Sequence, residues 1–189
     1  MQSSIITTLF LPIALAVIML GMGMSLEAAD FQDFLAFAGA FDLSGASVTA
    51  PFKADALAAA VEADGAARDT GAANTLVRAA GGWHAANTDV EGFLAPLADV
   101  ELRGLNAAII GGGGAARAAR HALARAGARV TTLGRGELDR ASAPWDLLVN
   151  ATPVGTAPDA QASVLESRPI RARIVYDLVY NPAETRLMA

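Results

Sequence analysis

A run of four glycines between an apolar segment and an alanine-rich segment most constrains how this chain can fold. The glycines occupy positions 111–114, after the apolar residues 107–110 and before residues 115–126. The apolar segment predicts a short buried strand, and the alanine-rich segment predicts a helix that ends at Gly127. Residues 129–133 predict the next strand. The order strand, glycine loop, helix, strand indicates an α/β fold with a parallel sheet.

The glycine loop has the context that a dinucleotide site requires. Glycines let the backbone approach a pyrophosphate, and the N-terminus of the following helix supplies amide donors and a partial positive charge. We therefore predict cofactor contacts from the loop and the first residue after it, namely Gly111, Gly112, Gly113, Gly114 and Ala115. A tight turn that packs a helix on a strand is the alternative explanation.

The end of the second strand bears on the choice of dinucleotide. Leu133 is followed by Gly134, Arg135 and Gly136. NAD sites usually place a carboxylate near this point for the ribose 2′-hydroxyl, whereas the 2′-phosphate of NADP needs a cation. Arg135 therefore favours NADP, although Glu137 lies close by. A solvated arginine is the alternative.

Further strands and helices follow from the apolar pattern elsewhere in the chain. Asp89 stands before a helix through Phe93 and Leu97, where it would serve as the N-cap. Two apolar runs flank Gly81 and predict a hairpin. The predicted strands are residues 46–49, 74–77, 83–87, 147–150 and 174–179, and the other predicted helices are residues 31–38 and 54–61.

Lysine usage singles out one position. Of the fourteen Lys and Arg residues, thirteen are arginine and one is Lys53. Arginine stays charged at any accessible pH, whereas a lysine amine can release and regain a proton. Lys53 is therefore a candidate acid/base, with an ordinary surface lysine as the alternative.

Composition excludes several other functions. The net charge is −5 and no basic stripe is present, so we expect no nucleic-acid partner. The chain has no cysteine, which excludes disulfides and thiolate catalysis. His84 and His121 are the only imidazoles and have no ligand cluster near them in sequence, so no metal site is predicted.

The N-terminal segment differs from the rest of the chain. Residues 1–26 carry no charge, and residues 5–26 are apolar apart from Thr7, Thr8 and Ser25. A membrane-spanning helix needs about 20 such residues, so we predict a transmembrane helix within residues 1–28. A buried core helix is the alternative. Residues 11–16 and 21–26 resemble the opening helix of the bile acid:sodium symporter family.

Six segments together resemble the shikimate dehydrogenase family over residues 31–189. They are Val-Thr-Ala-Pro-Phe-Lys at 48–53, Gly-Ala-Ala-Asn-Thr at 71–75, Asn-Thr-Asp at 87–89, Gly-Gly-Gly-Gly-Ala-Ala-Arg-Ala at 111–118, Asn-Ala-Thr-Pro-Val-Gly at 150–155 and Asp-Leu-Val-Tyr-Asn-Pro at 177–182.

The resemblance implies NADP-dependent interconversion of 3-dehydroshikimate and shikimate, a step of chorismate and aromatic amino acid biosynthesis. It implies that Lys53 and Asp89 are the catalytic pair. A lysine beside a carboxylate can exchange a proton with the reacting oxygen. The implied substrate-binding residues are Thr49, Asn74, Asp89 and Tyr180, and Thr152 and Gly155 are implied to border the cofactor. Asn74 and Thr152 are alternatively turn formers.

The resemblance leaves parts of the family unmatched. The family's first strand with its Ser-x-Ser loop and its closing helix have no counterpart, and Gly134-Arg135-Gly136 stands where the family has Asn-Arg-Thr. We therefore expect an apolar helix at 1–28, a partial substrate-binding domain at 29–101 and a truncated Rossmann-like NADP-binding domain at 102–189. The dehydrogenase part is expected in the cytoplasm, with residues 5–26 as a membrane anchor. A non-catalytic NADP-binding fragment and a membrane-anchored hybrid are the alternative functions.

Overall fold

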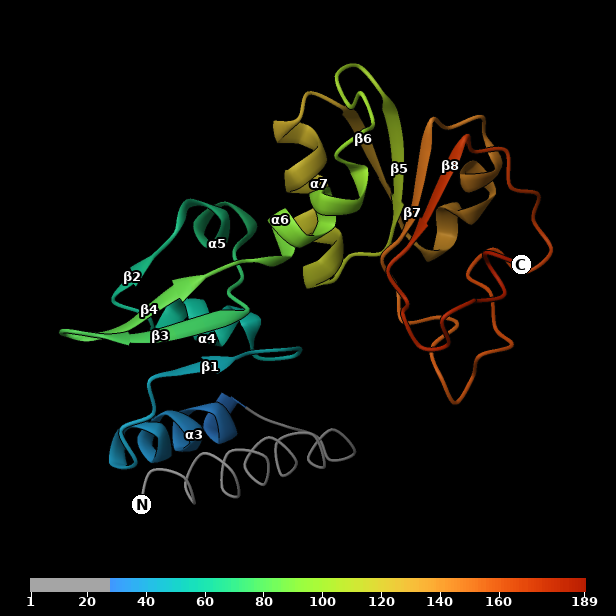
Figure 1. The fold of residues 1–189 in the computed structure, drawn as a ribbon. Coiled ribbons are helices and arrows are strands. Elements are labelled where there is room, and N and C mark those ends of the chain that lie inside the picture. Colours follow the sequence, from blue (N-terminus) through green and yellow to red (C-terminus); the bar gives the residue numbers. More distant parts are fainter. Residues whose placement is uncertain (1–27) are drawn as a thin grey trace. The chain divides into compact units, whose positions relative to one another are not determined.

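The computed structural model describes residues 28–189 (Figure 1). The transmembrane segment predicted at 5–26 lies outside these residues. Within the described part of the chain, no helix is both long enough and apolar enough to cross a membrane.

The chain divides into two compact units, residues 1–44 and residues 45–189. The first unit contains helix α3 (Ala28–Ala40), which includes the helix predicted over 31–38. Its residues Phe31 and Ala38 are buried, and the rings of Phe31 and Phe34 stack with centroids 6.0 Å apart. The spacing of these residues places them along one face of the helix.

The second unit begins with a mixed four-stranded sheet. Its order is β1 (Gly45–Ser47), β3 (Thr75–Ala79), β4 (Gly82–Ala86) and β2 (Glu62–Ala63). The strands β3 and β4 form the predicted hairpin, and β2 pairs with β4 in parallel. The hairpin turn uses Gly81 and Gly82 at positive φ, which glycine adopts without strain.

Two helices connect the strands of this sheet. The helix α4 (Lys53–Ala59) was predicted, whereas β2 and α5 (Gly65–Thr70) were not, because a two-residue strand and a six-residue helix carry no readable apolar period. The Asp64 carboxylate caps α5 by accepting the N–H of Ala67 at 2.6 Å. The buried side chains of this part include Ala56, Ala67, Leu76, Trp83 and Ala85.

The second sheet is parallel throughout. Its order is β6 (Arg129–Leu133), β5 (Asn106–Ile110), β7 (Leu147–Asn150) and β8 (Ile174–Asp177). After β5 the chain forms β6 on one side of β5, and it later crosses over to form β7 on the other side of β5. This reversal creates a crevice at the carboxyl ends of the strands, where ligands of open α/β sheets bind. The α/β class and the parallel sheet predicted from the glycine loop are thus confirmed.

Helices cover the two faces of the second sheet differently. On one face α7 (Gly114–Arg125) packs Ala119, Ala122 and Leu123 with Ile109 and Val149. The helix α6 (Asp89–Leu94) and the turn η3 (Ala95–Leu97) join the same core cluster through Val90, Phe93 and Leu97. Successive residues of a strand point to opposite faces of the sheet. On the other face of this sheet, Ala108 and Ile110 of β5 and Leu148 of β7 pack in a second core cluster with Ala141 of η4 (Arg135–Ser142).

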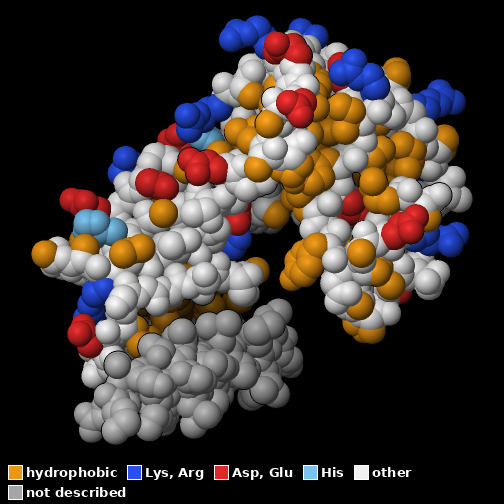
Figure 2. Space-filling view, in the orientation of Figure 1, with side chains coloured by type: hydrophobic (Ala, Val, Ile, Leu, Met, Phe, Trp, Pro, Cys, Tyr) orange, Lys and Arg blue, Asp and Glu red, His pale blue; other side chains and the backbone are white. Residues whose placement is uncertain are grey.

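The edge strand β8 is less well covered than the central strands. All residues of β7 are buried, whereas all four residues of β8 are half-buried. Figure 2 shows hydrophobic side chains gathered over the region of β7 and β8. Ile174 and Tyr176 are partly buried and pack against the core cluster that includes α7, and the Tyr176 ring stacks on Phe93 with centroids 5.1 Å apart.

Candidate functional site

The glycine loop lies at the carboxyl end of β5. Gly111 has φ +129°, and a Cβ there would approach the carbonyl oxygen of Ala151 to 2.9 Å. The N–H of Gly111 donates to the carbonyl of Leu133 at 3.2 Å. Glycine is thus needed here both for its backbone conformation and for the close approach of the loop that follows β7.

The rest of the loop is open towards the N-terminus of α7. A Cβ at Gly112 or Gly113 would meet nothing within 4 Å, and the N-cap Gly113 makes no side-chain cap bond. The N–H groups of the first turn of a twelve-residue helix therefore remain available to an anion. This arrangement fits the pyrophosphate of a dinucleotide.

A buried polar network fixes the loops after β7 and β8. Asn150 is fully buried, and its Nδ2 donates to Oδ1 of Asp177 at 2.9 Å. Its Oδ1 accepts the N–H of Thr152 at 3.1 Å and the hydroxyl of Thr152 at 2.7 Å. Thr185 donates to Asp177 at 2.6 Å. The buried Asn150 side chain needs hydrogen-bond partners, and Thr152 and Asp177 provide them. The two bonds to Asn150 hold Thr152 in place.

Lys53 is the first residue of α4, and its Nζ donates to Oδ2 of Asp89 at 2.6 Å. Its side chain is 18% exposed and that of Asp89 is 30% exposed, so the pair is partly removed from water. The predicted partnership of these two residues has the geometry of a charge-assisted hydrogen bond.

Asp89 does not cap its helix, which corrects the capping prediction. The N-cap of α6 is Thr88, and Asp89 is the first helical residue. The carboxylate of Asp89 instead accepts from Lys53 through one oxygen and from Asn74 Nδ2, at 2.8 Å, through the other. Two donors from other elements therefore engage the side chain that would otherwise bind the first turn.

Asn87 supports this arrangement and was not predicted. It is 3% exposed, and its Nδ2 donates to Thr70 Oγ1 at 2.9 Å and to the carbonyl of Ala72 at 2.8 Å. Its Oδ1 accepts the N–H of Asp89 at 3.0 Å. Asn87 thereby fixes the start of α6. The Asn-Thr-Asp motif carried this signal, but sequence alone gave Asn87 no role.

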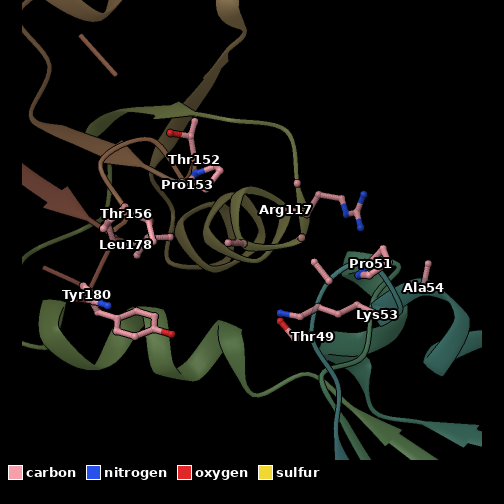
Figure 3. A pocket seen from close by; sticks show the side chains of 17 residues that line it. Thr49, Pro51, Lys53, Ala54, Arg117, Thr152, Pro153, Thr156, Leu178 and Tyr180 are labelled. Carbon is pink, nitrogen blue, oxygen red and sulfur yellow. The ribbon is translucent and has the colours of Figure 1, made fainter. Parts of the chain in front are cut away.

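An open cleft of about 550 Å³ is bordered by both Lys53 and the glycine loop. Figure 3 shows this cleft from close by. Thr49 and Lys53 lie on one side of it, and Thr152 and Tyr180 lie on the other. The predicted residues that line this cleft are Thr49, Lys53, Gly113, Gly114, Ala115, Thr152 and Tyr180. A second hollow of about 440 Å³ is lined by Lys53, Asp89, Ala115 and Leu178, among others. Lys53 therefore borders both spaces.

Some predicted residues lie elsewhere. Arg135 is exposed at the start of η4, and Gly155 is buried with φ +98°. The 550 Å³ cleft is not lined by Arg135, Gly155 or Asn74. Arg117 and Thr156 do line it, and no role was predicted for either. Among residues 28–189, no three potential metal ligands of the His, Cys, Asp or Glu type come together.

The second sheet is parallel, a glycine loop forms the turn from β5 to α7, and a lysine–aspartate pair lies beside that loop. Together these features define a dinucleotide-binding α/β protein of the dehydrogenase class. Comparison with known proteins gives the family. A family model described as shikimate dehydrogenase substrate binding domain matches residues 19–76, so the match begins within the apolar segment 1–28. The chain belongs to the shikimate dehydrogenase family.

Curated relatives support this assignment. The chain is 35% identical to the NADP(+) shikimate dehydrogenase of Synechocystis sp. over 84% of its own length and 66% of the relative's. It is 33% identical to the enzyme of Microcystis aeruginosa, covering 84% of this chain and 67% of that protein. The chain thus spans about two thirds of the length of these relatives.

A solved structure shares the fold. The shikimate 5-dehydrogenase of Thermus thermophilus, in complex with NADP(H) and shikimate, aligns with a TM-score of 0.66 and 34% identity. The alignment covers 77% of this chain and 62% of that one.

Proposed function

We propose that this chain acts as a shikimate dehydrogenase, interconverting 3-dehydroshikimate and shikimate with NADP. The observation that carries the proposal is the ion pair of Lys53 and Asp89, which lies at the edge of the cleft that the glycine loop borders. The curated relatives of this chain, which are named NADP(+) shikimate dehydrogenases, support the same assignment.

Lys53 is proposed as the proton donor to the reacting oxygen in ketone reduction, and as the proton acceptor in the reverse direction. Asp89 keeps the ammonium in place through the 2.6 Å bond and provides a carboxylate near the substrate hydroxyls. Asn74 fixes the other Asp89 oxygen at 2.8 Å. The ion pair therefore orients the lysine before substrate arrives.

Thr49 and Tyr180 are proposed to contact substrate from opposite sides of the cleft. Thr49 follows β1 on the Lys53 side, and Tyr180 lies in the loop after β8 with 90% of its side chain exposed. An exposed tyrosine beside a cleft can move to cover a ligand. Asn74 reaches the site through Asp89 and the Thr88 hydroxyl.

The cofactor contacts are proposed for the glycine loop with Ala115, for Thr152 and Gly155 after β7, and for Arg135 after β6. NADP supplies the hydride when it is bound. The amides of Gly112 and Gly113, where the loop borders open space, would hold the pyrophosphate, and Arg135 would lie towards the 2′-phosphate. Gly155 would act by shaping the turn, since it is buried at positive φ.

The domain division at residues 101 and 102 and the membrane anchor at 5–26 remain proposals. Residues 45–86 carry the first sheet and residues 106–177 carry the second, which supports two domains. The helix α6 nevertheless packs in the core of the second sheet. Membrane fractionation of the full chain and of a chain lacking residues 1–27 tests the anchor.

The experiment that tests the function is shikimate-dependent formation of NADPH by the purified chain, with Lys53→Ala as the control. Activity that disappears in the variant supports the proposal. If neither protein is active but NADP⁺ raises the melting temperature and shikimate does not, the chain is a non-catalytic NADP-binding protein. Equal activity of both proteins excludes Lys53 as the proton donor.

A further inference from the structure

The carboxylate of Glu137 occupies the loop that follows β6. Its Oε2 accepts the N–H of Gly134 at 3.1 Å, and its Oε1 accepts from Nη1 of Arg140. The side chain of Glu137 is 44% exposed and that of Arg140 is 57% exposed, so both face solvent at the surface of the loop. The family-type Asn-Arg-Thr sequence is replaced here by Gly134-Arg135-Gly136.

This loop adjoins the glycine loop. Residue Leu133 at the end of β6 pairs with Ile110 at the end of β5, and its carbonyl accepts the N–H of Gly111. In a dinucleotide fold, the end of this second strand meets the ribose that carries the 2′-substituent of the adenosine. Glu137 is therefore within the region that distinguishes NADP from NAD.

The two donors that Glu137 engages are of the chemical types that bind a phosphate. A 2′-phosphate is held by backbone N–H groups and by guanidinium groups, through charge-assisted bonds. Here the Gly134 N–H and Arg140 already serve a carboxylate, which also repels a second anion. Only Arg135, whose side chain makes no hydrogen bond or ion pair within residues 28–189, is left to attract the phosphate.

A ribose 2′-hydroxyl meets the opposite situation, because it can donate a hydrogen bond to a carboxylate. The hydrogen bond from the Gly134 N–H, and then the Arg140 guanidinium, hold the pKa of the Glu137 carboxyl below its usual range. Glu137 is thus an ionised acceptor at neutral pH.

We propose that Glu137 is a specificity-determining residue of the cofactor site, which opposes Arg135 and makes the site accept a 2′-hydroxyl as well as a 2′-phosphate. The protein would therefore bind NAD with an affinity close to that for NADP. This inference rests on the proposed function, because it requires the dinucleotide to lie along the loops after β5 and β6.

The test uses adenosine fragments and needs no turnover. Calorimetric titration of the full chain with 2′,5′-ADP and with 5′-AMP reports the ratio of the two affinities. The variant Glu137→Gln keeps an oxygen for the Gly134 N–H while it removes the charge. We expect about tenfold tighter binding of 2′,5′-ADP and a change of less than about twofold for 5′-AMP, because only the former carries the 2′-phosphate that the carboxylate repels.

Asp139→Asn is the matched control. Asp139 lies in the same element η4, carries the same charge and pairs with Arg168, not with Gly134 or Arg140. We expect this variant to leave the ratio of affinities within about twofold of the original.

Three outcomes would overturn the inference. An unchanged ratio in Glu137→Gln, with both fragments still bound, excludes Glu137 as the determinant and leaves the proposed function intact. An equal increase in Asp139→Asn shows that overall charge is responsible. Binding of neither fragment by the original chain contradicts the dinucleotide site itself, and the proposed function fails with it.

Discussion

Lys53 and Asp89, which lie 36 residues apart in the chain, form a hydrogen-bonded ion pair with Nζ 2.6 Å from Oδ2. The lysine opens α4 beside the first sheet, and the aspartate opens α6, which packs in the core of the second sheet. The pair therefore links the two parts of the second unit at the edge of the cleft.

Lys53→Ala should lower the rate of shikimate oxidation by roughly 10² to 10⁴-fold, as expected for the loss of a general acid/base. The affinity for NADP⁺, measured by calorimetry, should change little. Lys53→Arg is the control for charge, since arginine can retain the ion pair but stays protonated. A rate near that of the original protein in Lys53→Arg would contradict the proton-transfer role.

Asn87→Ala should lower the free energy of unfolding by about 1–3 kcal/mol, because a buried amide with three hydrogen bonds is lost. Urea denaturation followed by tryptophan fluorescence measures this change. Asn74→Ala is the comparison, since the bonds of Asn74 to Thr88 are exposed and its bond to Asp89 is only partly buried, whereas Asn87 bonds to Thr70 and Ala72 in a buried position. Its loss of stability should be smaller, and equal losses would show that burial does not set the difference.

Gly111→Ala should lower the free energy of unfolding by about 1–3 kcal/mol, the range for a residue forced into an unfavourable φ/ψ region. The added Cβ would also meet the Ala151 carbonyl at 2.9 Å. Gly112→Ala has open space at the same loop and should change the free energy of unfolding by less than about 0.5 kcal/mol. Equal denaturation midpoints for the two variants would be the contrary result.

Arg135→Ala should weaken NADP⁺ binding far more than NAD⁺ binding, because the exposed guanidinium acts on the 2′-phosphate. We expect a loss of about tenfold for NADP⁺ in calorimetric titrations, typical of one removed phosphate contact at moderate salt. Arg125→Ala, in the last turn of α7, removes an equal charge at the far end of that helix and should leave both affinities unchanged. Equal weakening of both dinucleotides by Arg135→Ala would contradict the assignment.

Asp146 gives a pH-dependent contribution to stability. The N–H of Asn106 donates to its carboxylate at 2.9 Å, and this bond lowers the pKa of Asp146 below its ordinary value of 3.8. A lowered native pKa contributes stability above the unfolded pKa, and that stability disappears as the pH falls through the native pKa. Asp146→Asn should therefore have a lower melting temperature than the original protein at pH 7.

The difference for Asp146→Asn should shrink as the pH falls below about 3.8, where the unfolded state becomes protonated, and should disappear once the pH is below the lowered native pKa, where the carboxylate is protonated in both states. Thermal scans at several pH values measure it. Asp99→Asn, another single-charge change, supplies the control for net charge. A difference that is constant from pH 7 to pH 3 would contradict the role of the ionised carboxylate.

Local patterns predicted the second sheet well. The central strands β5 and β7 are buried almost throughout, so their apolar runs were unbroken and easy to recognise. The glycine loop and the alanine-rich helix that follows it were confirmed because both depend on neighbouring residues. The strand β2 and helix α5 were missed, since their positions depend on pairing with β4 and on the Asp64 cap.

The sequence by itself determined the α/β class, the glycine turn and the identity of the single lysine, because composition and short-range spacing decide these features. Only the tertiary structure decided the partners. The residue pattern predicted that Asp89 would cap its own helix, and the family resemblance implied its pairing with Lys53, but the hydrogen bond that Asn74 donates to the other Asp89 oxygen was found only in the structure. Asn87 gained its role in the same way. Hydrogen bonds between side chains far apart in sequence depend on how the sheets and helices pack, and no local pattern records that packing.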